Sequence, residues 1–415
     1  MPNELTRPII VPLTTVQADW TEVVSDVVRG VIASGSFWVS CYRKGRPSVH
    51  GSVTIRKSQE DPMAVDFIGN DGLEVARVTN YSFAITCEQL GINGSIVKGP
   101  KATKKIHDSS VTAMDISPGG ALFVTGDEKG LIKVGDAKSG TTRRELIGHM
   151  AGIGTCRFFP SGQVVLSGSS DFQLRIWSVL DGSNPVTLQA HTKGITDSAV
   201  IDRGRNVLSS SRDGTIRLWE CGSASVIRTL GNYNAAVNKI ALGSVANDIR
   251  NWKNEEVDID SREVATDDKI VCCALESGTF SAIDLRSKNE AFSMNSYRNT
   301  ALYACTFDGR YAAVSGSAEG VIELYDIRNP SISTFAIQRN DAPIYDISFI
   351  NNKSSILVAP GDGAAFQFAL DSLPTMSSAA HEFVGFDVDP IYSIRTVDNG
   401  QLIYAVGRDG CLRRF

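Results

Sequence analysis

The chain lacks an excess of positive charge, because its 415 residues include 41 Lys and Arg against 46 Asp and Glu. Such a chain is poorly suited to neutralise the phosphates of a nucleic acid or the surface of an anionic membrane, so we expect neither as a partner. The sequence also lacks any run near the roughly 18 apolar residues of a membrane span, and its start lacks the basic flank and apolar stretch of a signal peptide. We therefore expect a soluble, intracellular protein, cytoplasmic and nuclear.

Paired cysteines and catalytic motifs are also missing. None of the eight cysteines belongs to a C-x-x-C pair, which argues against a zinc ribbon or a thioredoxin-type site and favours reduced, structural cysteines. The sequence contains no H-E-x-x-H, no G-x-S-x-G, no Walker loop and no G-x-G-x-x-G after a strand, and it has only five histidines. We predict no catalytic residue, no metal and no cofactor, and hence a protein that is not an enzyme.

Internal repetition is the strongest pattern that is present. Proline is scarce, at 14 residues, whereas glycine is frequent, at 37, which is typical of short strands joined by tight turns. The segments 168–177 (GSSDFQLRIW) and 210–219 (SSRDGTIRLW) align with a shift of 42 residues, and in each of them the Asp follows a histidine by 22 residues. This spacing indicates WD40 repeats, which form the blades of a β-propeller.

The repeat spacing also predicts a chain of hydrogen bonds inside a blade. The Asp in the turn accepts from the histidine of the preceding loop, the histidine bonds to a serine on the second strand, and that serine meets the indole N–H of the tryptophan on the third strand. Buried polar groups that are paired in this way fix the geometry of a blade, so we predict a structural role for them. Two complete sets are present: His149, Ser167, Asp171 and Trp177, then His191, Ser209, Asp213 and Trp219.

Weaker copies of the same template raise the predicted number of blades to seven. Each copy keeps a turn residue and, six residues later, a position equivalent to the tryptophan. The copies lie at Lys129 and Gly135, Ser277 and Ile283, Glu319 and Tyr325, Asp362 and Phe368, and Asp409 and Phe415. We therefore predict an all-β fold in which residues 100–415 form a seven-bladed WD40 propeller. Because the chain ends on the third strand of the last blade, residues 102–106 are predicted to supply the missing outer strand.

Residues 1–99 do not fit the template and are predicted to form a small N-terminal β-rich domain. Alternating apolar and polar residues predict several strands, and Asn70-Asp71-Gly72 is a good hairpin turn between two of them. A short helix is predicted near residues 20–28. The strands are predicted at 37–42, 48–56, 64–68, 73–79 and 82–87.

An insertion at about 243–268 lengthens the fourth blade between its first and second strands. This position places it on the face opposite the loops that carry the histidines. The insertion is acidic, and we interpret it as a solvated loop. Its acidic residues are Glu255, Glu256, Asp258, Asp260, Glu263, Asp267 and Asp268.

A partner-binding site is predicted on the top face, where the histidine loops and the turns between second and third strands lie. Three consecutive blades carry a tyrosine at the rim of the central channel, namely Tyr303, Tyr345 and Tyr392. Tyrosine anchors interfaces well, and carboxylates around it favour a partner with a basic surface. The alternative is that the tyrosines merely plug the channel. The acidic residues assigned to the same face are Asp341, Asp346, Asp387, Asp389, Glu128, Glu276 and Glu319.

Residues 158–222 resemble one WD40 family in particular. They read FFPSG at 158–162, LRIWSVLDGSNPVTL at 174–188 and IDRGRNVLSSSRDGTIRLWECG at 201–222. The general repeat does not require the DGSNP, IDRGRN and ECG portions, and these resemble the proteasomal ATPase-associated factor family, WD40 chaperones that assemble the base of the proteasome regulatory particle. Elsewhere the resemblance is one of layout, with a divergent N-terminal domain, seven blades and an elaborated fourth blade.

The resemblance implies a non-enzymatic chaperone, monomeric on its own, that binds the C-terminal domain of one proteasomal ATPase subunit and holds it until the ring is built. Two alternatives remain open. Asp284-Leu-Arg286 and Asp326-Ile-Arg328 put a D-x-R ending on two successive blades, which resembles WD40 substrate receptors of cullin-RING ubiquitin ligases. A general protein-interaction scaffold is the other alternative.

Overall fold

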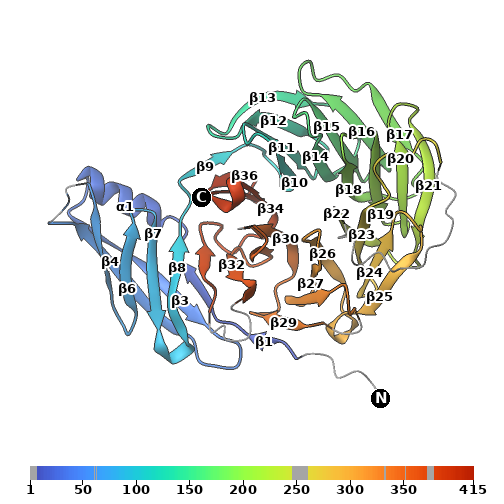
Figure 1. Cartoon of the computed structure of the whole chain (residues 1–415). Coiled ribbons are helices and arrows are strands. Elements are labelled where there is room, and N and C mark those ends of the chain that lie inside the picture. Colours follow the sequence, from blue (N-terminus) through green and yellow to red (C-terminus); the bar gives the residue numbers. More distant parts are fainter. Residues whose placement is uncertain are drawn as a thin grey trace.

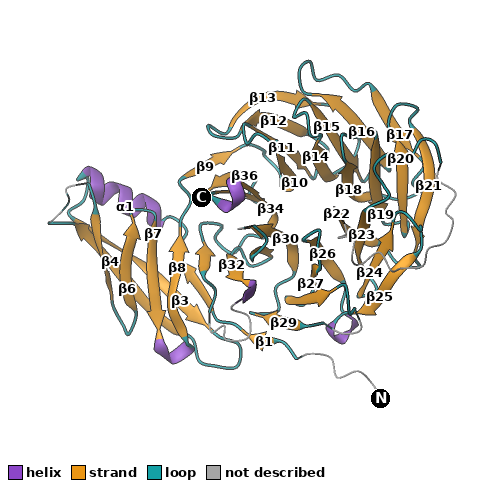
Figure 2. Ribbon diagram, in the orientation of Figure 1, coloured by secondary structure: helices purple, strands orange, loops and turns teal. Residues whose placement is uncertain are grey.

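The computed structural model describes residues 7–59, 61, 63–244, 260–330, 333–350, 352–371 and 378–415. In this part of the chain, seven sheets stand around a central axis and a smaller β-rich unit lies beside the ring (Figure 1). Strands dominate throughout, with few and short helices (Figure 2). The first strands of successive blades contact one another all the way round, and the first blade contacts the seventh. The predicted all-β, seven-bladed propeller is confirmed.

The blades follow one another in chain order, and each runs from the axis outwards. The first blade consists of β10 (Val111–Ile116), β11 (Leu122–Asp127), β12 (Ile132–Asp136) and β13 (Thr141–Leu146). The second consists of β14 (Ile153–Phe158), β15 (Val164–Ser169), β16 (Gln173–Ser178) and β17 (Val186–Gln189). The third consists of β18 (Ile195–Ile201), β19 (Asn206–Ser211), β20 (Thr215–Glu220) and β21 (Ser225–Asn232). The fourth and fifth consist of β22 (Val237–Ser244), β23 (Lys269–Leu275), β24 (Thr279–Asp284) and β25 (Glu290–Asn295), and of β26 (Leu302–Phe307), β27 (Ala312–Ser317), β28 (Val321–Asp326) and β29 (Phe335–Gln338). The sixth and seventh consist of β30 (Ile344–Ile350), β31 (Ser355–Pro360), β32 (Ala365–Ala369) and β33 (His381–Phe383), and of β34 (Ile391–Val397), β35 (Leu402–Gly407) and β36 (Cys411–Arg414).

The burial of a strand follows its place in the blade. Second strands such as β15 and β19 are buried along almost their whole length, because the neighbouring blades cover both faces of the sheet. The outer strand β13 instead alternates between exposed and half-buried residues before its end. The hydrophobic core therefore lies between blades. Trp177 of the second blade, for example, packs with Val124 and Val134 of the first.

Both predicted hydrogen-bond chains are present. In the second blade, His149 Nδ1 lies 2.7 Å from Asp171 Oδ2 and His149 Nε2 lies 2.8 Å from Ser167 Oγ, which accepts the indole N–H of Trp177 at 2.8 Å. The third blade repeats these contacts with distances of 2.8, 2.7 and 2.8 Å. Burial lowers the pKa of both histidines, against the opposing effect of the carboxylates. The neutral ring thus donates through Nδ1 and accepts the serine hydroxyl through Nε2.

Two weaker blades build related contacts from other residues. In the first blade, His107 Nδ1 lies 3.1 Å from Asp127 and its Nε2 lies 2.9 Å from Thr125 Oγ1, so the carboxylate comes from the end of the second strand and not from the turn. In the sixth blade, Asn340 donates to Asp362 at 2.6 Å in place of a histidine. The template located the turn in both blades, but in the first blade the acceptor is Asp127, two residues before Lys129, and in the sixth blade Asn340 replaces the histidine.

The ring closes through a strand from before the first blade, as predicted. Strand β9 (Ala102–Lys105) pairs antiparallel with β36, with Lys105 opposite Cys411 and Ala102 opposite Arg414. The N–H of Ile106 donates to Gly410 O at 3.0 Å and extends the ladder. The last blade thus has its fourth strand, and no open edge remains at the junction.

The segment before β9 forms a separate core around four aromatic rings. Trp20 and the rings of Phe37, Phe67 and Phe83 lie within 5.4–6.4 Å of one another, between the helix and two sheets. The predicted helix and strands are confirmed. Asp71 and Gly72 do form a left-handed turn, but β5 and β6 join different sheets, so the predicted hairpin ladder is wrong. The elements are β2 (Leu13–Val16), α1 (Trp20–Arg29), β3 (Ser34–Tyr42), β4 (Val49–Lys57), β5 (Val65–Gly69), β6 (Glu74–Thr79), β7 (Ser82–Cys87) and β8 (Ile92–Lys98).

This N-terminal unit shares its backbone hydrogen bonding with the propeller. Strand β8 pairs in parallel with β33, so that the sixth blade and the N-terminal unit form one seven-stranded sheet. Strand β1 (Ile9–Ile10) pairs in parallel with β29 on the outer edge of the fifth blade. The side chain of Ser95 also donates to Ala379 O at 2.7 Å. The boundary predicted at residue 99 falls between β8 and β9, but the sheet continues across the two units.

The acidic insertion lies between β22 and β23, as predicted, and its described end is packed. The side chain of Glu263 is buried, 3.1 Å from Lys288 Nζ and 3.9 Å from Arg228 Nε. The N–H of Val264 donates to Asn206 Oδ1 at 2.7 Å. The interpretation as a solvated loop is therefore wrong for Glu263. Asp260 pairs with Arg262 and Asp268 with Lys269, each at 2.7 Å, whereas Asp267 is exposed. The other three predicted acidic residues, Glu255, Glu256 and Asp258, lie outside the described residues.

Replacing Lys104 by proline is expected to open the ring. Lys104 lies opposite Leu412 and two residues before Ile106, and hydrogen-bonded positions alternate along an antiparallel pair, so proline removes a ladder hydrogen bond. We expect the free energy of unfolding to fall by about 1–3 kcal/mol in urea denaturation. Lys104→Ala keeps the N–H and should unfold like the wild type. Equal stability of the two variants would contradict the closing role of β9.

Replacing Asp213 by alanine should destabilise the third blade. Burial alone would raise the pKa of Asp213, but donors from Thr215, Thr192 and His191 outweigh burial and hold this pKa far below its usual range. The variant leaves the buried ring of His191 and the half-buried Thr215 without their acceptor, and we expect a loss of about 1–3 kcal/mol in the free energy of unfolding. Asp108→Ala, in the exposed loop beside His107, is the control. A melting temperature unchanged in both variants would refute the structural assignment.

Candidate partner-binding site

The three predicted tyrosines form one continuous row on the top face. Each occupies the second position of the first strand in its blade, on β26, β30 and β34. The rings of Tyr303 and Tyr345 are stacked, with centroids 6.1 Å apart and planes 3° from parallel. Tyr345 meets Tyr392 edge to face at 5.0 Å. All three side chains are half-buried, so the row presents aromatic surface supported from below.

The hydroxyl groups of this row remain protonated at neutral pH. Burial raises the pKa of Tyr303, and the Glu276 carboxylate adds to the effect. Burial likewise raises the pKa of Tyr392, where Arg408 opposes it and Glu128 and Asp389 add to it. Three of the predicted carboxylates, Glu276, Glu128 and Asp389, thus act electrostatically on the tyrosines. The row can therefore donate hydrogen bonds at its tip while offering an apolar ring face.

Most of the predicted acidic residues are available at the surface. Asp389 is half-buried, and Asp341 is paired with Lys44 of the N-terminal unit at 2.5 Å. Glu276 accepts from Asn238 at 2.7 Å. The exposed carboxylates are those of Glu128, Glu276, Glu319, Asp341 and Asp387. Exposed carboxylates and the aromatic row thus lie on the same face of the ring, and their role in binding a partner stays a prediction.

The same face also carries exposed cations, which the sequence analysis did not include. Lys193 and Arg212 lie on the third blade, and Arg408 lies beside Tyr392. Lys129 and Arg298 lie on loops of the first and fifth blades. The face is therefore mixed, because Lys129, Arg298 and Arg408 lie on the same blades as the carboxylates, and Lys193 and Arg212 add positive charge on the third blade.

Asp346 does not belong to this surface, contrary to the prediction. It is only 3% exposed, and it accepts from Ser393 Oγ at 3.1 Å and from the N–H of Ile394 at 3.0 Å. Arg395 lies 2.5 Å away. Burial alone would raise the pKa of Asp346, but Arg395 and Lys239 lower it, so the carboxylate is ionised. Its place on a central strand turns it towards the axis, where it joins the sixth blade to the seventh.

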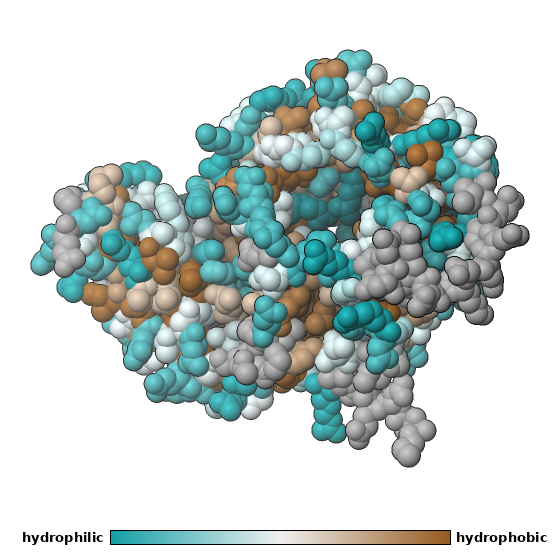
Figure 3. Space-filling model, in the orientation of Figure 1, coloured by the Kyte–Doolittle hydropathy of each residue, from teal (hydrophilic) through white to brown (hydrophobic). Residues whose placement is uncertain are grey.

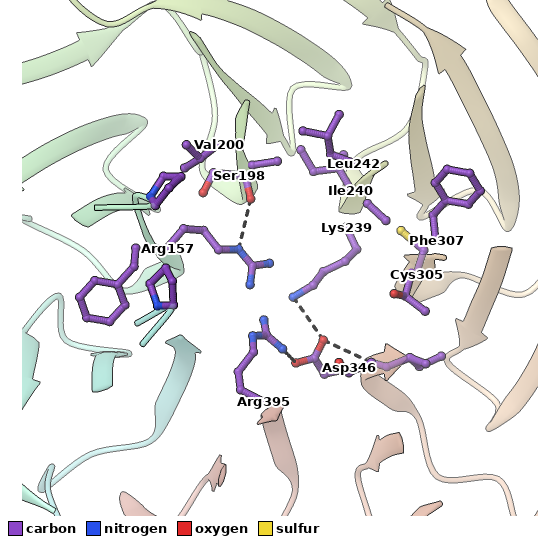
Figure 4. A pocket seen from close by; sticks show the side chains of 18 residues that line it. Arg157, Ser198, Val200, Lys239, Ile240, Leu242, Cys305, Phe307, Asp346 and Arg395 are labelled. Atoms are coloured by element: carbon purple, nitrogen blue, oxygen red, sulfur yellow. Dashed lines mark hydrogen bonds and ion pairs between the residues drawn. The ribbon is translucent and has the colours of Figure 1, made fainter. Parts of the chain in front are cut away.

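Asp346 is one member of a charged network inside the channel. Figure 4 shows Arg157, Lys239 and Arg395 reaching from three blades towards one cavity, which has a volume of about 470 Å³. Lys239 Nζ lies 4.0 Å from the carboxylates of both Asp197 and Asp346. Asp197 also accepts the N–H of Ile240 on the next blade, as Asp346 does for Ile394. The sequence analysis missed this network, although charged residues recur on first strands that face the axis.

The described residues hold no group of three His, Cys, Asp or Glu side chains arranged for a metal ion. The eight cysteines are unpaired, and six of them are buried. No helix within the described ranges has the length and apolar character needed to cross a bilayer.

Replacing Asp346 by asparagine should destabilise the ring without a specific effect on binding. The change removes the carboxylate next to Arg395 and Lys239, and breaking a buried ion pair in this way costs about 3–5 kcal/mol. Asp387→Asn, in an exposed loop, should leave the free energy of unfolding unchanged. Chemical denaturation measures both. If Asp346→Asn is as stable as the wild type, the structural role of Asp346 is contradicted, and Asp346 is again a candidate for partner binding.

Comparison with known proteins agrees with the fold. A family profile described as "WD domain, G-beta repeat" matches residues 99–136, 140–178 and 182–220. The chain is 38% identical over 402 residues to Proteasomal ATPase-associated factor 1 of Homo sapiens, and 38% identical over 400 residues to the protein of that name from Bos taurus. Both alignments cover 96% of this chain and 97% of the relative.

A more distant relative is similar over the same length. Probable proteasomal ATPase-associated factor 1 of Dictyostelium discoideum is 36% identical over 431 residues, which covers 97% of this chain and 96% of that protein. The similarity therefore includes the N-terminal unit as well as the seven blades. The chain belongs to the proteasomal ATPase-associated factor family.

Proposed function

We propose that this protein is a non-enzymatic assembly chaperone that binds the C-terminal domain of a proteasomal ATPase subunit while the base of the regulatory particle is built. The names of its relatives support the choice of an ATPase as partner. The observation that carries the mode of binding is the tyrosine row, in which Tyr303, Tyr345 and Tyr392 stack at the top rim beside exposed carboxylates. Half-buried aromatic rings of this kind are typical anchors of an interface.

The charge of the site indicates the chemistry of the partner surface. Glu128, Glu276 and Asp387 suit a helical domain that exposes lysines, and complementary charge speeds association most at low salt. The stacked rings need little reordering on binding, because each is held by its neighbour. The proposal therefore assigns fast encounter to the carboxylates and slow release to the tyrosines. We also propose that the protein is monomeric on its own and acts in the cytoplasm and nucleus.

The D-x-R endings on which the ubiquitin-ligase alternative rests also have local structural roles. In the fifth blade, Arg328 is bound to Asp326 of its own motif at 2.6 Å, and its guanidinium stacks on Tyr311 at 4.2 Å. In the fourth blade, Asp284 accepts the backbone N–H of Arg286 at 2.9 Å. Both D-x-R endings thus satisfy local turns, which accounts for their recurrence without a shared partner.

Variants of the top face should separate the effect of the carboxylates on the association rate from the effect of the tyrosines on the dissociation rate. In binding measurements with recombinant C-terminal domains of the proteasomal ATPases, Asp387→Lys with Asp389→Lys should slow association and flatten its salt dependence. Tyr345→Ala should mainly raise the dissociation rate, by about tenfold or more. Asp181→Lys with Asp202→Lys, two exposed positions on the opposite face, is the matched control.

The outcomes distinguish the alternatives. If the Asp181 and Asp202 control loses binding and the top-face variants do not, the interface lies on the opposite face and the proposed top-face site is wrong. A wild-type protein that binds none of the ATPase domains and co-purifies with a cullin adaptor would contradict the proposed function itself.

A further inference from the structure

A shallow groove runs between the N-terminal unit and the top of the sixth and seventh blades. Thr15, Val16 and Trp38 form one wall, and the turn at 362–364 and the loop at 384–388 form the other. The groove has a volume of about 40 Å³, enough for the end of one side chain. Figure 3 shows apolar surface on the N-terminal unit on the side shown there. Both parts of the chain thus contribute to one small surface next to the tyrosine row.

Trp38 is exposed in a strand whose alternate residues are buried. On β3, Phe37 and Val39 point into the aromatic core, and period-two alternation turns Trp38 to the other face of the sheet. There it is 46% exposed. A large indole left partly in water beside a groove is the kind of side chain that carries binding energy at interfaces.

The facing loop of the propeller is strained and ends in an exposed apolar residue. Asp387 and Val388 have φ angles of 52° and 57°, in the left-handed region that a β-branched residue rarely adopts. Val388 is also 78% exposed, so no burial of its side chain offsets the strain. Strained residues of this kind cluster at functional sites, because there the local conformation serves recognition.

The two walls are joined by backbone hydrogen bonds and by an ion pair. The parallel ladder between β8 and β33 runs directly into the loop, and the N–H of Val384 donates to Lys98 O at 3.0 Å. Lys44 reaches over from the N-terminal unit to Asp341 of the top face. A groove that is formed in advance loses less entropy when it is filled.

The groove is continuous with the proposed interface and has the same charge. The loop that carries Val388 leads through Asp389 into β34 and Tyr392. Asp362 and Asp387 line the groove, and none of its lining residues is basic. The groove therefore suits an apolar side chain that projects from a basic segment, on the same partner that meets the tyrosine row.

We propose that the N-terminal unit is the second wall of the partner-binding site, in which Trp38 and Val388 clasp an apolar side chain from a basic segment of the ATPase C-terminal domain. This inference rests on the proposed function and assigns a role to the N-terminal unit. The propeller provides the tyrosine row and the carboxylates, and the N-terminal unit provides the apolar anchor. A partner bound by both units contacts two parts of the chain that the β8–β33 ladder holds together.

Binding by full-length variants tests the inference against the same recombinant ATPase domain. Trp38→Ala should weaken binding about tenfold or more, mainly through the dissociation rate. Val388→Asn should also weaken binding, but should keep or raise the melting temperature, because asparagine tolerates the left-handed conformation. Since both side chains contact one group of the partner, the double variant should lose less than the product of the two single losses. Tyr81→Ala, 42% exposed in the N-terminal unit, and Leu180→Asn, 70% exposed on the opposite face, are the controls.

The possible results bear differently on the two proposals. If the wild type binds and Tyr345→Ala weakens binding while Trp38→Ala and Val388→Asn bind normally, the composite site is overturned and the proposed function stands. Losses in the two controls equal to those of Trp38→Ala also overturn it. If the wild type binds no proteasomal ATPase domain, the proposed function and the composite site are overturned together.

Discussion

Closure of the ring by the ladder between β36 and β9 is the interaction on which the other features depend. A four-stranded blade cannot bury both of its faces alone, so every blade needs a neighbour on each side. The chain that follows the sixth blade supplies only three strands, β34 to β36, for the seventh blade. Strand β9, which precedes the first blade, is its fourth strand. This pairing brings the two ends of the propeller together, and the tyrosine row exists only because the fifth to seventh blades are held in the ring.

Two of the remaining outer edges are covered by the N-terminal unit. Strand β1 lies along the fifth blade and β8 along the sixth, both in parallel. Unpaired outer strands would offer templates for aggregation, and these additions remove that hazard on one side of the ring. They also explain why the N-terminal unit is fixed beside the top of the sixth blade, where Lys44 reaches Asp341.

Charge is divided between the channel and the top face according to solvent access. Inside the channel, Asp197 and Asp346 are nearly inaccessible, and each is satisfied by a cation and by a backbone N–H of the next blade. On the top face, Asp387 and Glu128 are exposed, and within the described residues their carboxylates do not join one blade to the next in this way. The same kind of carboxylate therefore stabilises the ring in one place and stays exposed to solvent in the other.

The sequence by itself determined the repeat, the seven blades, the hydrogen-bond chains of the second and third blades, the closing strand and the alignment of the three tyrosines. These features follow from local spacing, because a period of 42 residues and an Asp placed 22 residues after a histidine are properties of the chain alone. Only the tertiary structure decided that Asp346 faces the channel, that Glu263 is buried against Lys288, and that β8 joins β33. These outcomes depend on contacts between residues far apart in the chain, where direction towards the axis or towards a neighbouring unit is set by packing and by the electrostatic requirements of buried charges.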